Sequence, residues 1–241
     1  MSPHSKDATG IDVPILVFAT RNTHKTHELE VHVAESGAAA LVLTLDQAAA
    51  ELGLPPPPEV DEDQPSFAGN AIKKARAIAT WAGRPALADD SGLEVDALGG
   101  EPGVHSARWA AATWPPGTTH GSRIADQANN IQLLARLAGK PESRRSARFR
   151  CVVALADPRG PLADGNLTGE GACEGRILNA PRGDGGFGYD PLFYAPELGA
   201  TFAEAPRGGK HAVSHRARAM AALAPALRDY LTRLAKAPGF R

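Results

Sequence analysis

The sequence predicts an α/β fold, because strand-like and helix-like patterns both recur along the chain. The run Ile15 to Ala19 is apolar throughout and follows a proline, which is typical of a strand buried on both faces. In residues 147–155 the apolar side chains of Ala147, Phe149 and Cys151 alternate with Arg148 and Arg150, the pattern of a strand. Residues 67–81 and 214–234 instead repeat apolar side chains at helical spacing. One chain therefore combines strands with amphipathic helices.

Length and composition indicate a folded, water-soluble protein. With 241 residues, of which 43% are hydrophobic and 22% charged, the chain can bury a substantial core as ordinary globular proteins do. No apolar segment approaches the roughly 18 residues that a membrane helix needs, and the first ten residues lack the apolar core of a signal peptide. We expect residues 1–12 to be a disordered tail, and the length of residues 13–241 allows one large domain or two small ones.

Charge and cysteine content narrow the function classes. The formal net charge of -1 gives no general attraction to nucleic acid or to an anionic membrane, so we expect neither as a partner. The two cysteines, Cys151 and Cys173, lack CxxC spacing, which argues against a disulfide framework and against a zinc site. A reducing, cytoplasmic location fits this cysteine usage best.

A polar turn, Thr20 to Lys25, follows the first predicted strand and leads into helix-like sequence. A helix that begins at Thr23 or His24 would direct its free backbone N–H groups and its positive dipole end at this turn, which suits a phosphate group. A capped helix with solvated basic residues is the alternative interpretation. His24, His27 and His32 match neither HExxH nor zinc-finger spacing, so we expect a solvated helix face there.

Short elements and an acidic segment come next. Residues 41–45 and 47–52 predict a strand and a brief helix, and the four prolines at 55–58 predict an extended loop. The carboxylates that follow are Glu59, Asp61, Glu62 and Asp63. Ser66 should then cap a helix over residues 67–81. Acids just before a helix are favoured by its dipole without any metal, so their placement alone does not decide their role.

Two adjacent carboxylates, Asp89 and Asp90, end the apolar run of residues 86–88. We expect a strand there, a tight turn at residues 91–92, and a second strand over residues 93–97, where apolar and acidic side chains alternate. Turn chemistry alone accounts for two such acids in one interpretation, and a metal or acid–base site in the other. Successive strand residues face opposite ways, so we expect only one of the two to point into a site.

The second half of the chain predicts a loop, a helix and a hairpin. Residues 113–122 predict a mobile loop, and the helix that begins near Arg123 should end at Gly139. The apolar face predicted for this helix comprises Ile124, Ala128, Ile131, Leu134 and Ala138. A hairpin of residues 147–155 and 167–173 should follow.

Between Asn179 and Asp190 the sequence NAPRGDGGFGYD is rich in glycine and proline. Such a backbone can pass close to a ligand, and we expect it to leave Phe187 and Tyr189 exposed for stacking. The last helix should cover residues 214–234, and its interior proline should kink or divide it.

The polar features of these segments fall into two chemical kinds. Cations and amide donors are Asn22, Lys25, Lys74, Lys210, His215 and Arg216. Hard oxygen ligands are Asp61, Glu62, Asp89 and Asp90. Magnesium takes carboxylate, water and phosphate oxygens, while basic side chains neutralise the remaining phosphate charge. The two kinds together are typical of a site for a nucleoside triphosphate with Mg²⁺. Asn70 and Lys74, one helical turn apart, share a face of the predicted helix 67–81.

Five segments, in this order, resemble one family. They are ATRNTHKTHELE, SFAGNAIKKA, ALADDSGLEVDALGGEPGVHSAR, GGFGYDPLF and SHRARA. Each is weak alone, but together, between Ile15 and Leu234, they are similar to the Ham1/RdgB-type inosine triphosphate pyrophosphatases, house-cleaning enzymes for non-canonical purine nucleotides. The resemblance implies an ITPase-like (Maf/Ham1) α/β fold with a long mixed sheet, flanking helices and two lobes around a nucleotide cleft. It also implies a homodimer.

The resemblance further implies the reaction and the roles of particular residues. A nucleoside triphosphate would be hydrolysed to the monophosphate and pyrophosphate with Mg²⁺, Asp90 acting as the catalytic base. The matched metal ligands are Asp61, Glu62 and Asp90. The matched substrate contacts are Thr20, Arg21, Asn22, Thr23, His24, Lys25, Ser91, Phe187, Gly188, Tyr189, Asp190, Lys210, His215 and Arg216. We expect Lys74 to assist Asp90 in activating water for attack on the α-phosphorus.

The chain departs from the family pattern at three places. Arg21 stands where glycine is frequent, and brings an added cation. Gly69 replaces a glutamate before Asn70. The acidic pair is Asp61 with Glu62 instead of two glutamates, and Gln64 stands where glycine is common, so which acid holds the metal is left open. No required chemical group is lost.

Two other functions remain open from the sequence. One is a related Maf-type pyrophosphatase, which shares the broad fold but acts on other nucleotides. The other is a nucleotide-binding module without turnover. The family resemblance also implies a reason for excluding ATP. Hydrogen-bond donors aimed at the 6-oxo group of a purine cannot pair with the 6-amino group of adenine.

Overall fold

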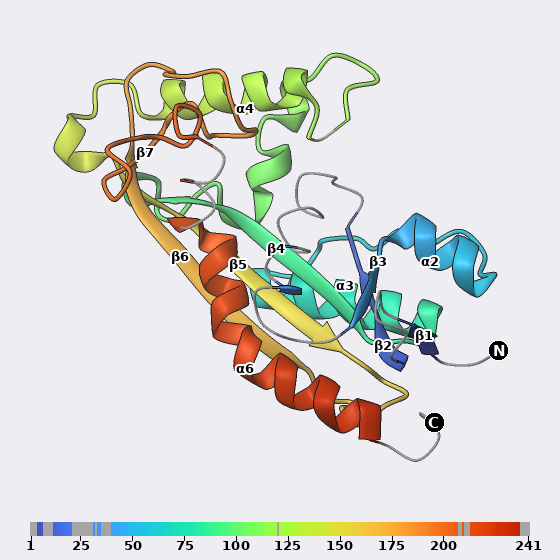
Figure 1. Ribbon diagram of the computed structural model, residues 1–241. Helices are drawn as coiled ribbons and strands as arrows, with labels where there is room; N and C mark the ends of the chain where they lie inside the picture. The colour runs from blue at the N-terminus through green and yellow to red at the C-terminus, as the bar shows by residue number, and fades with distance from the viewer. Residues whose placement is uncertain are drawn as a thin grey trace. The chain divides into compact units, whose positions relative to one another are not determined.

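The computed structural model describes residues 4–6, 12–20, 31, 33–34, 40–119, 121–206, 209 and 213–236. Within them the chain forms a mixed eight-stranded sheet with flanking helices (Figure 1). The strands are β1 His4–Lys6, β2 Asp12–Phe18, β3 Leu41–Leu43, β4 Ala86–Val95, β5 Ser146–Ala156, β6 Leu167–Ile177, β7 Phe193–Ala195 and β8 Ala200–Thr201. The α-helices are α2 Leu45–Leu52, α3 Phe67–Ala82, α4 Arg123–Arg136 and α6 His215–Lys236. Short 3₁₀ helices are Asp96–Leu98, Gly103–Arg108, Ala111–Thr113 and Glu142–Arg144. The predicted α/β class with a long mixed sheet is confirmed.

The strand order is β1-β2-β4-β5-β6-β7-β8, with β3 paired to β2. β2 runs parallel to both β3 and β4, with Ile15 opposite Leu41 and Val17 opposite Ala86. Residues 13–18 of β2 are all buried, as expected of an apolar strand covered on both faces. Because Ala19 N donates to Leu87 O at 2.8 Å, the chain leaves β2 beside residues 88–90 of β4.

The chain divides into two compact units. Unit 1 comprises residues 1–90, 152–171 and 216–241, and unit 2 comprises residues 91–151 and 172–215. The division falls within β4, β5 and β6, so each unit is built from segments that are distant in sequence. In unit 1, a Cβ added to Gly169 of β6 would lie 2.3 Å from Ala219 O, so a glycine is needed where α6 packs.

Unit 2 has an aromatic core. The Phe149 ring stacks on that of Phe202 with centroids 5.6 Å apart, and meets Phe193 edge-on at 4.7 Å. The predicted hairpin is confirmed as the neighbouring strands β5 and β6, although β6 continues four residues further, to Ile177. Cys151 and Cys173 are both buried, and neither takes part in a disulfide.

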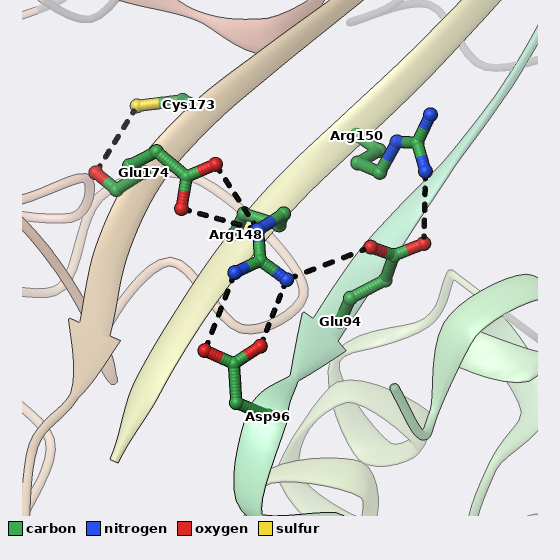
Figure 2. A network of polar contacts seen from close by, with 6 residues as sticks. All are labelled: Glu94, Asp96, Arg148, Arg150, Cys173 and Glu174. Carbon is green, nitrogen blue, oxygen red and sulfur yellow. Dashed lines mark hydrogen bonds and ion pairs between the residues drawn. The ribbon is translucent and has the colours of Figure 1, made fainter. Parts of the chain in front are cut away.

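A network of ion pairs links residues of β4, β5 and β6 with Asp96, the first residue of the 3₁₀ helix after β4 (Figure 2). Arg148 of β5 places Nη1 2.9 Å from Asp96 Oδ1 and Nε 3.0 Å from Glu174 Oε1. Glu94 of β4 places Oε1 3.6 Å from Arg150 Nη1 and Oε2 3.9 Å from Arg148 Nη1. Hydrogen bonds to Asp96 raise the pKa of Arg148 further, so this guanidinium stays charged. The network joins β4, β5 and β6 through side chains as well as backbone.

The turn predicted at residues 91–92 is wrong. β4 is one strand of ten residues that runs from Ala86 through to Val95. The chain turns only after Val95, where Gly99 and Gly100 adopt positive φ angles of 67° and 93°. Leu93 N donates to the Ser106 hydroxyl at 2.9 Å, which satisfies this backbone group in the extended conformation.

The face of α4 that packs against the core differs from the predicted apolar face. Ile124 and Ile131 are 54% and 69% exposed. The buried residues of the helix are Ala125, Asn129 and Leu133. The period was helical, but a polar residue takes a core position, because the Asn129 amide accepts from Ala110 N and donates to backbone carbonyls.

The ends of the chain differ from the prediction in detail. His4–Lys6, within the segment predicted as a disordered tail, forms β1 and pairs antiparallel with β2. Residues 1–3 and 7–11 of that segment lie outside the described residues. α6 begins at His215 and continues through Pro225, which therefore does not divide the helix. None of the described helices is long and apolar enough to cross a membrane.

Candidate active site

A lysine and two carboxylates come together in unit 1, between α3 and β4. Lys74 places Nζ 2.5 Å from Glu62 Oε1 and 3.8 Å from Asp90 Oδ1. The Lys74 and Asp90 side chains are only 13% and 6% exposed. Ser66 caps α3 as predicted, which fixes where the helix begins. Lys74 therefore lies two turns into the helix, within reach of both carboxylates. One cation therefore bridges two acids that the sequence assigned to catalysis and metal binding.

Asn70 connects Asp90 to the backbone of Gln64 through its amide. Its Nδ2 donates to Asp90 Oδ2 at 2.9 Å, and its Oδ1 accepts from Gln64 N at 2.9 Å. The side chain is fully buried with both ends bonded. The sequence placed Asn70 on the face of Lys74 but assigned it no role. The one available signal was the spacing of four residues between them.

Lys74 is held in its charged form. Burial alone would lower its pKa, but the negative charges of Asp90, Asp89 and Glu62, with the hydrogen bond to Glu62, outweigh that effect and raise its pKa. The ammonium group therefore stays positive at neutral pH, and offsets the cost of placing several carboxylates together.

Asp89 faces a different partner from Asp90, as expected for successive strand residues. Its Oδ2 lies 3.2 Å from Arg216 Nε at the start of α6, and both side chains are at most 2% exposed. The preceding residue, His215, belongs to unit 2, where its ring stacks on Phe149 with centroids 4.9 Å apart. The ion pair with Asp89 was not foreseen from the sequence, since the two residues are 127 positions apart.

Positions 64 and 69, where the sequence predicts departures from the family pattern, lie close together. A Cβ added to Gly69 would lie 2.8 Å from Gln64 Cβ and 3.3 Å from its Cγ. Real Cβ atoms do not approach so closely, so a side chain at position 69 conflicts with the one at position 64. Glycine at position 69 therefore fits beside glutamine at position 64.

The predicted base-binding segment of unit 2 presents one aromatic ring, not two. Phe187 is half-buried, but Tyr189 is only 4% exposed and belongs to the core with Phe193. The exposure predicted for Tyr189 is therefore wrong. Its hydroxyl donates to Ser106 O at 2.9 Å, and burial raises its pKa well above the ordinary value. An anchored tyrosine fixes the segment instead of stacking on a ligand.

Side chains of α4 contact the same segment. Asp126 Oδ2 accepts from Gly188 N at 2.8 Å, and Asn130 Nδ2 donates to Gly188 O at 2.8 Å. Asp190 is buried, and its Oδ2 accepts from Phe187 N at 2.9 Å. Neither Asp126 nor Asn130 stood out in the sequence, where both look like ordinary polar residues of a helix.

The other predicted site residues differ in exposure, and several fall outside the described part of the chain. Thr20, at the end of β2, and Ser91, on β4, are half-buried, and Asp61 is exposed. Arg21, Asn22, Thr23, His24, Lys25 and Lys210 lie outside the described residues. In the described part of the chain, no three His, Cys, Asp or Glu side chains gather as a ready set of metal ligands.

The chemistry of the cluster in unit 1 nevertheless fits magnesium. Glu62 and Asp90 offer hard carboxylate oxygens, and both already contact one cation, the Lys74 ammonium. Magnesium needs only one or two carboxylates, because water and substrate phosphates complete its octahedral shell. Two carboxylates beside a buried lysine can thus bind Mg²⁺ with phosphate and accept a proton from water.

The Ham1 family model matches residues 16–226. A dITP/XTP pyrophosphatase from Desulforamulus reducens is 48% identical over 206 residues, which cover 85% of this chain and 91% of the relative. A second one, from Geobacter sulfurreducens, is 47% identical over 86% of this chain and 94% of its own.

Solved structures agree. A HAM1 protein from Coxiella burnetii superposes with a TM-score of 0.74 at 34% identity, over 89% of this chain and 98% of the other. A nucleoside-triphosphatase / dITP/XTP pyrophosphatase from Mycobacterium abscessus does so with a TM-score of 0.67 at 40% identity, over 89% and 100%. Sequence identity, fold and the order of the motifs point the same way: the chain belongs to the Ham1 family.

Proposed function

We propose that this enzyme hydrolyses non-canonical purine nucleoside triphosphates, namely ITP, dITP, XTP and dXTP, to the monophosphate and pyrophosphate, and so cleanses the nucleotide pool. The observation that carries the proposal is the Lys74 ammonium held between Glu62 and Asp90. Relatives at 47% and 48% identity over most of the chain carry the name dITP/XTP pyrophosphatase, which supports the substrate class.

Asp90 is the general base in this mechanism. It takes a proton from a water molecule whose oxygen bonds to the α-phosphorus, while the bond from that phosphorus to the bridging oxygen breaks and pyrophosphate leaves. Asn70 fixes the carboxylate through Oδ2, so Oδ1 faces the Lys74 side. Lys74 adds a fixed positive charge where negative charge develops on the phosphates.

Glu62 and Asp90 would hold Mg²⁺, with Asp61 as the further ligand suggested by the family pattern. The ion would neutralise phosphate charge and polarise the phosphoryl oxygens when bound. Because Asp61 is exposed while Glu62 contacts Lys74, the contacts favour Glu62 as the ligand from the acidic pair.

The segment Phe187 to Asp190 binds the base in this proposal, with Phe187 stacking on it. Tyr189 contributes by anchoring the segment, because its ring is buried and its hydroxyl is bonded. Discrimination follows from hydrogen-bond polarity, since donors placed for a 6-oxo group would be left unpaired beside the 6-amino group of ATP.

The remaining substrate contacts stay as proposed from the motifs. The triphosphate is bound by the turn Thr20 to Lys25, with Ser91, Lys210, His215 and Arg216 as further contacts. The placement of Thr20 at the end of β2, where the chain leaves the sheet beside residues 88–90, supports this role for the turn.

The proposal includes a single ITPase-like domain with two lobes, acting as a homodimer in the cytoplasm. Two buried cysteines that form no disulfide support a reducing compartment. Ile124 and Ile131, which are seven residues apart on α4 and largely exposed, offer an apolar surface for a second copy. Sedimentation of the parent chain and of Ile131→Lys tests this, with a monomeric parent as the contrary result.

A nucleotide panel tests the function. Pyrophosphate release is measured with Mg²⁺ for dITP, XTP, dATP, dGTP, dTTP and UTP. Release from dITP and XTP with little from the others is expected. Release mainly from dTTP or UTP would indicate a Maf-type activity, and binding of dITP without release would indicate a binding module.

A further inference from the structure

Three side-chain hydrogen bonds fix the backbone around Phe187. Asp190 Oδ2 accepts from Phe187 N at 2.9 Å. Asp126 Oδ2 accepts from Gly188 N, and Asn130 Nδ2 donates to Gly188 O, each at 2.8 Å. Both backbone groups of Gly188 are thus held by α4, so the peptide that joins it to Phe187 cannot rotate without breaking a hydrogen bond.

The two α4 side chains act from a rigid support. Asp126 and Asn130 are four residues apart, which places them on one helix face and lets them reach the same residue. The helix is anchored next to them, since Asn129 is 1% exposed and accepts from Ala110 N at 2.8 Å. Leu133, one turn on, is fully buried. Asp126 and Asn130 thus form a clamp on Gly188, and movement of this clamp would disrupt the core of unit 2.

The segment needs such a clamp because its own sequence does not define its shape. Gly186 and Gly188 have positive φ angles of 72° and 61°, which glycine adopts at no steric cost but also leaves readily. A Cβ on Gly186 would lie 2.1 Å from Asp190 Oδ2, so a side chain cannot replace the missing stiffness there. Contacts from outside the segment must supply it.

The polar groups of Asp126 and Asn130 are costly to bury. Burial, followed by the charge of Asp190, raises the pKa of Asp126 despite the bond from Gly188 N. Asn130 Oδ1 is buried and has no hydrogen-bond partner among the described residues. The Gly188 carbonyl fixes the amide orientation, because a flipped Asn130 would set two oxygens against each other. Polar groups held at such a cost indicate a role beyond packing.

We propose that Asp126 and Asn130 are positioning residues that hold Phe187 in the orientation that stacks on the purine base, so that α4 sets the affinity for the base. This rests on the proposed function, in which Phe187 stacks. The two residues touch neither the phosphates nor the reacting atoms in this account. They act on base binding and leave the chemical step unchanged.

The test is the affinity for dIMP, measured by calorimetry, together with kcat and KM for dITP. Asn130→Ala and Asp126→Ala should each raise the Kd for dIMP about fivefold, the effect of losing one hydrogen bond, and should raise KM with little change in kcat. Asp126→Asn, which keeps an acceptor for Gly188 N, should stay close to the parent. Gln127→Ala, at an exposed position of the same helix, is the matched control.

A double-mutant cycle separates positioning from general damage. In a Phe187→Ala background, Asn130→Ala should add almost nothing to the Kd, because the clamp acts through the ring that has been removed. Additive losses, or a fall in kcat at constant KM, would overturn the proposal, and Asn130→Ala decides it even where Asp126→Ala does not fold. If the parent binds dIMP but releases no pyrophosphate, the proposed function fails while the cycle on dIMP still tests the clamp.

Discussion

Asn70 Nδ2 donates to Asp90 Oδ2 at 2.9 Å from a fully buried position at the start of α3. The other end of the same amide accepts from Gln64 N at 2.9 Å. A single side chain thus fixes the proposed base and the loop that carries Glu62. Asn70 therefore links the orientation of Asp90 to the position of the loop that contains Gln64.

Replacement of Asn70 should therefore impair turnover more than binding. Asn70→Ala is expected to lower kcat about tenfold, because an unoriented carboxylate reacts less often in the productive geometry, while KM for dITP changes less than threefold. Stability should fall by ~1–3 kcal/mol, since Gln64 N loses its acceptor. Steady-state kinetics on folded protein checks this. Lys73→Ala, which removes an exposed ion pair on the same helix, is the control, and an unaltered kcat in Asn70→Ala would contradict the role.

Gly69 and Gln64 should behave as a coupled pair. Gly69→Glu is expected to destabilise the protein by ~1–3 kcal/mol, because its Cβ would overlap Gln64. Adding Gln64→Gly should recover most of that loss, since the conflicting side chain is removed. Urea unfolding of the parent, both single variants and the double variant gives the coupling energy. Strictly additive effects would show that the two positions are independent.

Asp126 should give a pH-dependent stability difference. Its pKa is raised by burial and by the charge of Asp190 above the ordinary value of 3.8, so it contributes stability in acid that is lost as the pH rises through the folded-state pKa. Asparagine does not ionise but still accepts from Gly188 N. The free energy of unfolding of Asp126→Asn, relative to the parent, should thus increase from acid to neutral pH. A constant difference across that range in urea titrations would refute the shift.

Phe187 and Tyr189 should separate binding from stability. Tyr189→Phe loses the hydrogen bond to Ser106 O and is expected to cost ~1 kcal/mol of stability with kcat/KM close to that of the parent. Phe187→Ala should weaken dITP binding with little loss of stability, because its half-buried ring adds little to the core. Thermal unfolding and kinetics on both variants check the pair. The account is contradicted if Tyr189→Phe is the variant that loses affinity.

Much of the fold was predictable because its elements have strong local signals. The apolar run of β2, the alternation in β5 and the Ser66 cap of α3 each depend on neighbouring residues. The residues that form a helix were easier to predict than the face of the helix that packs against the core. In α4 the buried Asn129 is stabilised by carbonyls of residues 106 and 107, which no local pattern records.

The candidate site was predictable where motifs marked it and unpredictable where distant partners decide. Asp90, Lys74 and Glu62 were named from the motifs and lie in contact. The exposure predicted for Tyr189 from the glycines around it is wrong, because its burial depends on core residues such as Leu133 and Phe149, which are distant in the sequence. The ion pair of Asp89 with Arg216 and the hold of α4 on Gly188 likewise arise only on folding.

The central claim is that Asp90 is the general base of a dITP pyrophosphatase, and Asp90→Asn tests it most directly. Pyrophosphate release from dITP with Mg²⁺ is measured for the parent and the variant, and the Kd for dITP is measured alongside. The variant keeps a side chain of the same size beside Asn70 and Lys74 but cannot take a proton from water. We expect release to be abolished while the Kd stays within a few-fold of the parent. Full release of pyrophosphate by Asp90→Asn would contradict the account.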